Sequence, residues 1–468
     1  MNNEINKNPK LFPPAPTLKK LIGPSFIILA LGLGSGEVIL WPYLASNYGL
    51  GIVWGACLGI TFQYFINMEI ERYTLVKGES IFVGTAKIFK KAPYWFIFST
   101  FLGFGLPGII AASAQIFGSV LGIENFKWLA ILFLILIGII LSTGKTVYGM
   151  MEKITKTVIL LGIPFIFILT IILASSADWS LLAQGIVGKG EGFWFLPSGI
   201  ALATFLAAFA YSGAGGNLNL TQSIYIKEKG YGMGQYSQKI VGLFANFKNK
   251  QQVKLIGENF VATPENLKNF KKWWKLISLE HLLVFWFIGL LSMMFLMLLS
   301  FVTTHGVLGT AEGINFVIFE GQIIGQLLFP ALGTFFLVVI SIMLFQTQLG
   351  VMDSTSRIMA ENVAIKTLAK KSNSDINLSK IYFGFVWAQI MFGIILFLFN
   401  FYDPKTLIIL GAVINAFAMF VHIGLTSWVN YKQLPSSCQP KLWRRLIMLG
   451  IFLFFAFFSG VVLIDKFF

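Results

Sequence analysis

Apolar runs of about 20 residues recur along the whole of the 468-residue chain, and they constrain its fold more than any other feature. Each run is long enough to cross a hydrocarbon core roughly 30 Å thick. The runs are continuously apolar and do not alternate with polar residues, which indicates helices and argues against a membrane barrel. With 56% hydrophobic and 12% charged residues, the composition excludes a water-soluble protein. The sequence therefore predicts an all-α polytopic membrane protein.

The positions of the charged residues indicate the topology of the chain. We place eleven membrane segments near residues 21–46, 50–70, 93–121, 126–142, 156–176, 194–224, 274–304, 321–348, 380–400, 405–430 and 443–464. With the N-terminus in the cytoplasm, the cytoplasmic side carries 31 of the 35 Lys and Arg residues and the outer side carries four. This distribution follows the positive-inside rule and places the C-terminus outside. The net charge of +15 therefore reflects topology and requires no nucleic-acid partner.

Three polar stretches lie at the predicted cytoplasmic side. Residues 1–20 are rich in Asn, Lys and Pro and are predicted to be a disordered tail. The loop over residues 227–275 carries ten lysines and ends in KNFKKWWK, which favours an amphipathic segment at the membrane surface against anionic lipid. At the end of segment 2, Glu69 and Glu71 stand next to Arg72 and indicate an interfacial charge cluster.

Two membrane segments contain glycine and small polar residues at their centres. The first contains GLGSGE (32–37) and the sixth contains YSGAGGNLN (211–219). Glycine costs about 1 kcal/mol relative to alanine inside a helix, so the clusters predict unwound breaks; close packing between helices is the alternative explanation. Interrupted helices at matching positions favour a transporter domain, here 21–464, with inverted repeats over about 21–176 and 194–430 and a midplane site.

The first segment, from GPSF (23–26) through GSGEVILWP to FQYFINMEIERYTLVKGES (62–80), resembles the start of the Nramp divalent-metal transporters. In that family a Gly-Pro start leads to an unwound Asp-Pro-Gly-Asn motif, and a Gln-Tyr pair follows, here Gln63-Tyr64. NLNLTQS (217–223) resembles the sequence after the family's Met-Pro-His motif, and QLGVMDSTSRIMAEN (348–362) resembles its eighth helix. The resemblance covers most of the chain. It implies a LeuT-type fold of five-plus-five inverted repeats with discontinuous helices 1 and 6, plus an eleventh helix.

The chain departs from the family at the residues that bind metal. The family's metal-binding Asp falls on Gly34 and its Asn on Glu37. The Met and His of Met-Pro-His fall on Ala214 and Gly216. A thioether favours softer transition metals, so its loss predicts weaker selection against Mg²⁺ or Ca²⁺. The chain therefore resembles a divergent Nramp-related branch that lacks both motifs, and some relatives of that kind carry magnesium.

The residues that serve proton movement in the family also differ. The acidic residues of its third helix fall on Ala112 and Gln115, which predicts poor proton coupling or a uniporter. Gln115, Asp353 and His422 are our candidates for gating or coupling. Asp353 is equally explained as a helix cap or vestibule charge at the cytoplasmic end of segment 8. A lone intramembrane histidine such as His422 is equally explained as a hydrogen-bonded packing residue.

Glu37 is an acidic residue in the middle of the first membrane segment. A carboxylate near the bilayer centre costs at least about 3 kcal/mol and is stabilised by a bound cation, a partner or a proton. Almost every Lys and Arg lies at a cytoplasmic end, so we interpret Glu37 as the main ligand of a cation or a substrate ammonium. A structural hydrogen bond to a neighbouring helix is the alternative. Oxygen ligands from the breaks would suit hard cations. The candidate ion-binding residues are Glu37, Gly34, Ser35, Tyr211, Ala214, Asn217 and Asn415, with Glu37 and Asn217 as side-chain metal ligands.

These features favour a secondary transporter or uniporter that moves metal cations, of Mn/Fe type or Mg type, by alternating access. The alternative is a Na⁺- or H⁺-coupled symporter of a small organic solute such as an amino acid on the same fold, because the glycines enlarge the site and half-helix N-termini bind carboxylates. The sequence has no nucleotide loop, HExxH motif or nucleophile elbow, so we do not expect an enzyme. We expect no cofactor besides the transported ion. The resemblance implies a bacterial inner membrane, and the oligomeric state stays open.

Overall fold

The computed structural model describes residues 9–17, 21, 23–143, 147–238, 254–306, 313–370 and 376–467. Over these residues the chain is helical, apart from connecting segments and one isolated bridge between Lys189 and Trp194. Nine helices in this part are long and apolar enough to cross a membrane. Together with α7 (Lys127–Thr143) and the interrupted pair α10 (Leu202–Ala210) and α11 (Leu218–Lys229), they correspond to the eleven predicted segments. The protein is an integral multi-pass membrane protein.

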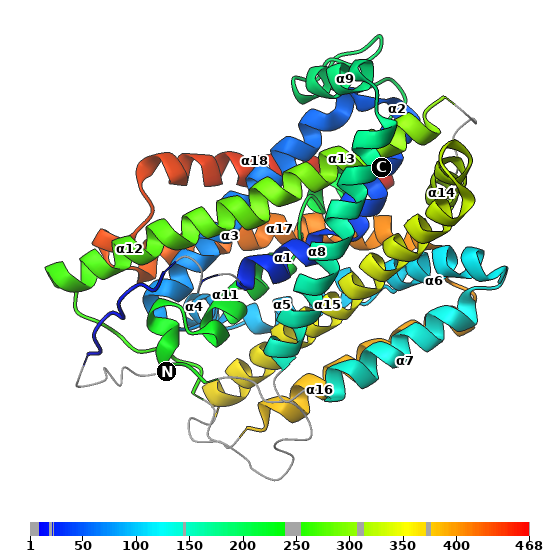
Figure 1. The fold of residues 1–468 in the computed structure, drawn as a ribbon. Coiled ribbons are helices and arrows are strands. Elements are labelled where there is room, and N and C mark those ends of the chain that lie inside the picture. The colour runs from blue at the N-terminus through cyan, green and yellow to red at the C-terminus, as the bar shows by residue number, and fades with distance from the viewer. Residues whose placement is uncertain are drawn as a thin grey trace.

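The other spans follow the predicted order. They are α1 (Pro24–Gly32) with α2 (Trp41–Tyr48), α3 (Val53–Lys77), α5 (Ala92–Phe104) with α6 (Gly108–Leu121), α8 (Val147–Leu173), α12 (Pro264–His281) with α13 (Ile288–Thr304), α15 (Pro330–Lys370), α16 (Leu378–Leu398), α17 (Pro404–Gln433) and α18 (Leu442–Phe467). Three shorter helices connect them: α4 (Ile81–Ile88), α9 (Ser176–Ile186) and α14 (Asn315–Leu327). Figure 1 shows one bundle, with α9 and α14 at one end and α4 and the start of α12 at the other.

Segment 8 begins later and is longer than predicted. The sequence predicted a span near 321–348, but α14 ends at Leu327 and α15 begins at Pro330. Proline has no amide hydrogen and is favoured in the first turn of a helix, so Pro330 separates the two helices. The 41 residues of α15 correspond to a length of about 60 Å, roughly twice the hydrocarbon thickness. α15 is therefore the longest single element of the described bundle.

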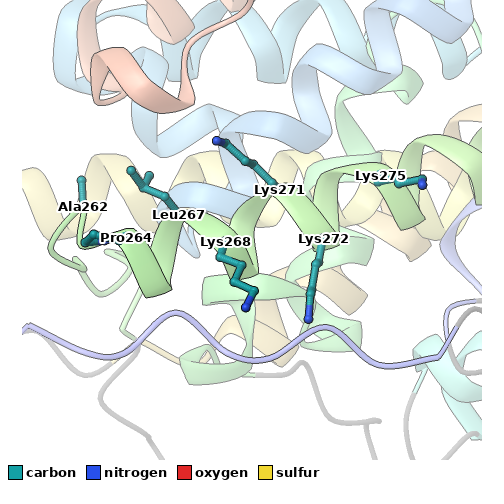
Figure 2. A pocket seen from close by; sticks show the side chains of 7 residues that line it. All are labelled: Ala262, Pro264, Leu267, Lys268, Lys271, Lys272 and Lys275. Carbon is teal, nitrogen blue, oxygen red and sulfur yellow. The ribbon is translucent and has the colours of Figure 1, made fainter.

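The lysine-rich end of the loop forms α12, which leads through a π-helical turn, η6 (Leu282–Phe287), into α13. The predicted amphipathic character is confirmed, because Phe270 and Trp273 are buried whereas the lysines are exposed. Figure 2 shows Lys268 and Lys272 on one side of α12 and Lys271 on the other, so their ammonium groups do not converge. The hollow beside them is lined by Ala262, Pro264, Leu267, Lys268, Lys271, Lys272 and Lys275. Contact with anionic lipid stays a prediction.

Residues 9–17 adopt a defined conformation, which corrects the prediction of disorder for that part of the tail. The Phe12 side chain is 1% exposed, and its ring packs edge-on against Phe270 at a centroid distance of 6.0 Å. Trp273 donates its indole N–H to Pro13 O at 3.0 Å. A buried aromatic ring and hydrogen bonds therefore tie this segment to α12.

The charge cluster predicted at the end of α3 forms in part. Glu69 accepts hydrogen bonds from Arg72 (2.8 Å) and from Arg444 of α18 (2.5 Å), and all three side chains are buried. Glu71 instead accepts from Gln222 of α11 at 2.6 Å. The prediction is therefore correct for Glu69 and wrong for Glu71, because residues two apart face different sides of a helix.

Candidate functional site

The first membrane segment is interrupted at its centre, as predicted. α1 ends there, and after Leu33 and Gly34 the chain continues as a π-helix, η2 (Ser35–Leu40), that leads into α2. The interruption frees carbonyl groups, and the Thr347 hydroxyl of α15 lies within hydrogen-bond distance of two of them, the nearer being Leu33 O (2.8 Å). A β-carbon on Gly34 would lie 2.3 Å from Thr347 Cγ2, so only glycine fits against this threonine.

The sixth segment is interrupted between α10 and α11. Gly213, Gly215 and Gly216 have φ angles of 129°, 71° and 51°, in the left-handed region that favours glycine. Gln63 of α3 braces this break: its amide donates to Ala210 O (2.9 Å), and its Oε1 accepts from Gly215 N (3.0 Å). One side chain therefore satisfies both a carbonyl and an amide of the unwound chain, which gives the break a fixed shape.

The two breaks touch each other directly. A β-carbon on Gly36 would lie 1.8 Å from Tyr211 O, and one on Gly32 would lie 2.7 Å from Gly213 Cα. Real β-carbons essentially never approach other atoms below 3.0 Å. The glycines therefore allow the two backbones to approach closely, so unwinding and close packing occur at the same positions.

Glu37 lies in the first turn of η2, where the two breaks meet, and is fully buried. Neither of its carboxylate oxygens has a hydrogen-bond partner among the residues that the structure describes. Its surroundings include glycines: Oε1 lies 2.7 Å from the β-carbon position of Gly32 and 3.8 Å from that of Gly289 in α13. An ionised carboxylate without a partner in such a place costs several kcal/mol. Glu37 is therefore a strong acceptor for a positively charged group.

A second group of polar side chains contacts the sixth-segment break from α5 and α17. Asn217 donates to two hydroxyl groups of α5, and Asn415 of α17 donates to the Tyr211 hydroxyl at 2.8 Å. His422 Nε2 lies 2.9 Å from Gly216 O, so this nitrogen carries the hydrogen and Nδ1 is the acceptor of a neutral ring. Asn217 Oδ1, Asn415 Oδ1 and His422 Nδ1 are buried, and in the described part of the chain each lacks a partner.

The predicted ligands thus fall into two groups. Glu37 lies beside α13, and Gly34 belongs to the same break and packs on α15. Asn217 and Asn415 contact α5 and the Tyr211 side of the sixth-segment break. No hydrogen bond within the described ranges joins Glu37 to either asparagine. The structure therefore gathers these residues around the two breaks without bringing their polar groups into one contact.

Three other predicted residues have clear positions. Ser35 (5% exposed) starts η2, and Ala214 (2% exposed) lies in the sixth-segment break. Gln115 lies outside both breaks in α6 and donates to Asn315 Oδ1 of α14 at 3.1 Å. Its hydrogen bond therefore joins α6 to α14, the connecting helix before α15.

Asp353 lies inside α15 and is fully buried, so the helix-cap explanation is wrong. Its carboxylate accepts from Arg357 Nε (2.8 Å) and from the hydroxyl groups of Tyr382 (2.7 Å) and Tyr225 (3.0 Å). Arg357 also donates to Glu228 of α11 at 2.6 Å. Asp353 therefore belongs to a buried ion-pair network that joins α15 to α11 and α16.

Sequence analysis did not assign Thr347 or Gln63 to the site, although both brace the unwound chain. For Thr347 the available signal was the polar triplet 346–348 inside an apolar helix. For Gln63 it was one amide in an otherwise apolar stretch, noted only for its resemblance to the family's Gln-Tyr pair. Polar residues in a membrane helix favour such contacts with freed backbone groups.

No protein-family model matches the chain. No curated protein matches its sequence significantly. Among solved structures, a mutant of the manganese transporter of Eremococcus coleocola has a TM-score of 0.68 at 10% identity, over 98% of this chain and 90% of that one. The same transporter in complex with an aromatic bis-isothiourea substituted compound has a TM-score of 0.66 at 11% identity, over 97% and 89%. MhsT in complex with L-phenylalanine has a TM-score of 0.50 at 15% identity, over 95% and 98%.

At these identities the likeness establishes the fold. The predicted LeuT-type fold is confirmed, with an interrupted first segment, an interrupted sixth segment and an eleventh span, α18, after the ten that build the two repeats. Fold alone does not determine what such a protein binds. The chemistry has to be argued from the residues at the two breaks.

Proposed function

We propose that the protein is a transporter that moves metal cations across the membrane by alternating access, with Glu37 as the main cation ligand. The observation that carries the proposal is the Glu37 carboxylate, which is buried, unpaired among the described residues and located where two unwound segments meet. A buried carboxylate is stabilised by a positive charge brought to it. A cation bound between the breaks supplies that charge.

Oxygen atoms of the two breaks would supply the remaining ligands. They are the carbonyl groups of Gly34 and of Tyr211–Ala214, the Ser35 hydroxyl, and the amide oxygens of Asn217 and Asn415. The described residues contain no group of three or more His, Cys, Asp and Glu side chains placed to hold a metal, so the site would combine one carboxylate with neutral oxygens. Oxygen ligands suit Mg²⁺ and also Mn²⁺.

The two unwound segments could change shape when the ion binds. Asn217 and Asn415 each keep a buried amide oxygen without a partner in the described part of the chain, and these oxygens could turn to an ion held by Glu37. Unwound backbone between rigid helices absorbs such changes in φ and ψ readily. Gln115, Asp353 and His422 are our candidates for gating or coupling in this cycle. The Lys and Arg distribution supports a cytoplasmic N-terminus, and we propose a bacterial inner membrane as the location.

The close contact between the breaks favours an ion over an organic solute. An amino-acid-sized substrate would have to separate Gly36 from Tyr211 and Gly32 from Gly213, whose backbones are already in contact. A metal ion, with ligand distances of about 2.0–2.6 Å, requires much less space. The Na⁺- or H⁺-coupled symporter of a small organic solute is the second candidate. It is supported by the shared fold of MhsT, whose structure contains L-phenylalanine.

Flux into proteoliposomes tests the proposal, with Mn²⁺, Fe²⁺, Mg²⁺, Ca²⁺ and Na⁺ offered in turn to the wild type, Glu37→Gln and Glu320→Gln. Glu320 is the matched control because it is a second buried carboxylate (3% exposed) with an unpaired oxygen in the described part, and it lies on α14, outside both breaks. We expect a divalent ion to enter with the wild type and with the control. Glu37→Gln should lose at least about tenfold, since an interaction with a charged group is worth about 1.5–3 kcal/mol.

Two results would contradict the proposal. If no divalent ion enters under any gradient, the protein is not a carrier of these metals, and amino acids are the next panel. If a divalent ion enters equally well with Glu37→Gln, transport occurs without Glu37 as a ligand.

A further inference from the structure

A buried cluster of two carboxylates, a histidine, a serine and a glutamine lies apart from the two breaks and has no part in the proposed ion site. Its members come from four elements: Ser25 of α1, Glu71 of α3, Gln222 of α11, and Glu280 and His281 of α12. All five are between 0% and 4% exposed. The cluster therefore links α1 and α11, which lead into and out of the two breaks, to α3 and α12.

One serine hydroxyl joins a carboxylate to the histidine. Ser25 Oγ is in hydrogen-bond contact with Glu280 Oε2 and lies 2.9 Å from His281 Nδ1. The same histidine nitrogen lies 3.3 Å from Glu71 Oε1, which also accepts from Gln222 Nε2 at 2.6 Å. Polar contacts therefore run without interruption from Glu280 through Ser25 and His281 to Glu71.

No arginine neutralises Glu71 within the described ranges, in contrast to its neighbour Glu69. Glu69 is paired with both Arg72 and Arg444. Arg444 interacts with Glu71 only by electrostatic attraction over a distance, since its guanidinium is hydrogen-bonded to Glu69. The aromatic neighbour of the cluster on α3, Tyr64, stacks on the imidazole at 5.7 Å. Glu71 is therefore a buried carboxylate whose direct partners are an amide and an imidazole.

The cations nearest to Glu280 are likewise engaged elsewhere. Lys156 of α8 and Lys229 of α11 act on it from a distance, and they bind Glu152 at 2.6 Å and 2.9 Å. The hydroxyl of Tyr231, which also faces this region, donates to Leu21 O, three residues before α1. Glu280 Oε1 has no partner in the described part of the chain. Two buried carboxylates without an ion pair to lysine or arginine strongly favour the uptake of a proton.

The geometry of Ser25 provides a route for that proton. When Glu280 is protonated, it donates to Ser25 Oγ, which donates its own hydrogen to the bare Nδ1 of a neutral His281. Breaking the Glu280 O–H bond, forming a new Oγ–H bond and passing the serine hydrogen to Nδ1 leaves a carboxylate and an imidazolium. The imidazolium then lies between Glu280 and Glu71. Only hydrogens move in this step, so charge and atoms balance.

The elements α12, η6 and α13, which follow one another in the chain, connect the cluster to the residues around Glu37. His281 stacks on Phe285 with 4.7 Å between ring centroids, and Phe285 Cζ lies 2.9 Å from the β-carbon position of Gly213 in the sixth-segment break. Gly289, further along the same helix, is the glycine beside Glu37. The ring of Phe285 therefore separates the cluster from the breaks and contacts both.

We propose that Glu71, Ser25, Glu280 and His281 form a proton-binding site, distinct from Glu37, that couples proton movement to transport. The proton site stands on the contacts described above. Its coupling to transport rests on the proposed function, for which it makes the proton the coupling ion. Ser25 is the link, because it is the member that α1 contributes and α1 ends at the first break. Displacement of α1 during the cycle would separate Ser25 from Glu280 and His281 and interrupt the proton route. Proton transfer would then depend on the conformation of the ion site. If the proposal holds, the carrier is coupled to protons, in contrast to the poor coupling that the missing acidic residues of the third segment predict.

Infrared difference spectroscopy of the purified full-length protein, between acidic and neutral pH, tests the proton site without reference to transport. We expect a titrating carboxyl band in the wild type that Glu280→Gln removes. Glu361→Gln is the matched control, because Glu361 is also buried (2% exposed) and its carboxylate is paired with Lys227 at 2.8 Å. The proposal is overturned if the wild type and Glu280→Gln show the same titrating bands.

The coupling is tested with Ser25→Ala in proteoliposomes that report metal entry and internal pH together. We expect the ratio of protons to metal ions to fall by at least about tenfold, and Ser25→Thr, which keeps a hydroxyl, to restore it. Ser223→Ala is the control, because Ser223 is a buried serine whose hydroxyl, within the described residues, bonds only its own helix, at Leu220 O (2.6 Å). Wild-type metal entry without a pH change, or an unchanged ratio in Ser25→Ala, overturns the coupling and leaves metal transport standing.

Absence of metal entry in the wild type is a different outcome and rejects the proposed function. In that case the infrared comparison alone tests the proton site. The same holds if Ser25→Ala abolishes metal entry, because no ratio of protons to metal ions can then be measured.

Discussion

Replacing Gly36 by alanine should force the two breaks apart. The added methyl group would lie 1.8 Å from Tyr211 O, whereas ordinary contact begins at 3.4 Å, so the two groups would have to separate by the difference, 1.6 Å. Neither group lies at the end of a flexible side chain, because one is a backbone carbonyl and the other is fixed to Cα. Rotamer changes therefore cannot relieve the overlap, and the backbone has to move.

The magnitude follows from that displacement. Overpacking of a well-packed interior costs about 1–3 kcal/mol. A misplacement of about 1 Å at a functional site costs on the order of 10²-fold in rate. We therefore expect Gly36→Ala to lower metal uptake by about 10²-fold and to lower the temperature of unfolding in detergent. Both measurements use the proteoliposome and purified preparations of the flux experiment.

Gly384→Ala is the matched control for this substitution. Gly384 lies in α16, is exposed, and a β-carbon there would meet nothing within 4 Å. Alanine is favoured over glycine inside a helix by about 1 kcal/mol, so uptake should be unchanged and the unfolding temperature equal or higher. If Gly36→Ala behaves like this control in both assays, the direct contact between the breaks is refuted.

Two further substitutions test the elements around the site. Gln63→Leu would remove the donor to Ala210 O, at a cost of roughly 1–3 kcal/mol, whereas Gly215 N keeps a second acceptor in Asn219 Oδ1 at 3.0 Å. Thermal unfolding should therefore occur at a lower temperature, and an unchanged temperature would mean that Gln63 does not brace the break. Phe12→Ala should release residues 9–17 and speed tryptic cleavage after Lys10, whereas Leu11→Ala, at a side chain that is 73% exposed, should not. Equal cleavage of both variants and the wild type would contradict docking of the segment.

The fold and the position of the two breaks followed from local properties of the sequence. The length of each apolar run predicted a span, and the glycine clusters at 32–37 and 211–219 predicted both breaks at the correct places. Glu37 was singled out because an acidic residue in an apolar run is costly wherever the helices pack. These inferences needed no knowledge of which helices are neighbours.

The inferences that failed or were never made depend on neighbours distant in sequence. Ser25 and Glu280 are 255 residues apart along the chain, and no local pattern indicates their contact. Asp353 resembled a helix cap because the hydropathy of its segment falls there. α15 nevertheless continues past it, and the hydroxyl groups that Asp353 accepts from belong to Tyr225 of α11 and Tyr382 of α16, which are distant in the sequence. Helix periodicity alone separates Glu71 from Glu69, but the partners of Glu71, Gln222 and His281, are distant in the sequence, and no local pattern indicates them.

The unbroken helix α15 contacts both interrupted segments, but it is attached to them with unequal strength. At Thr347 it holds the break after α1 by one neutral hydroxyl, which donates to either of two carbonyl groups and is worth about 1 kcal/mol net. At Arg357, about 15 Å further along, it holds the second half of helix 6 by a buried ion pair with Glu228, whose loss costs several kcal/mol. We therefore expect thermal motion to release the first attachment more often than the second, so that α1 would depart first while α11 stays with α15.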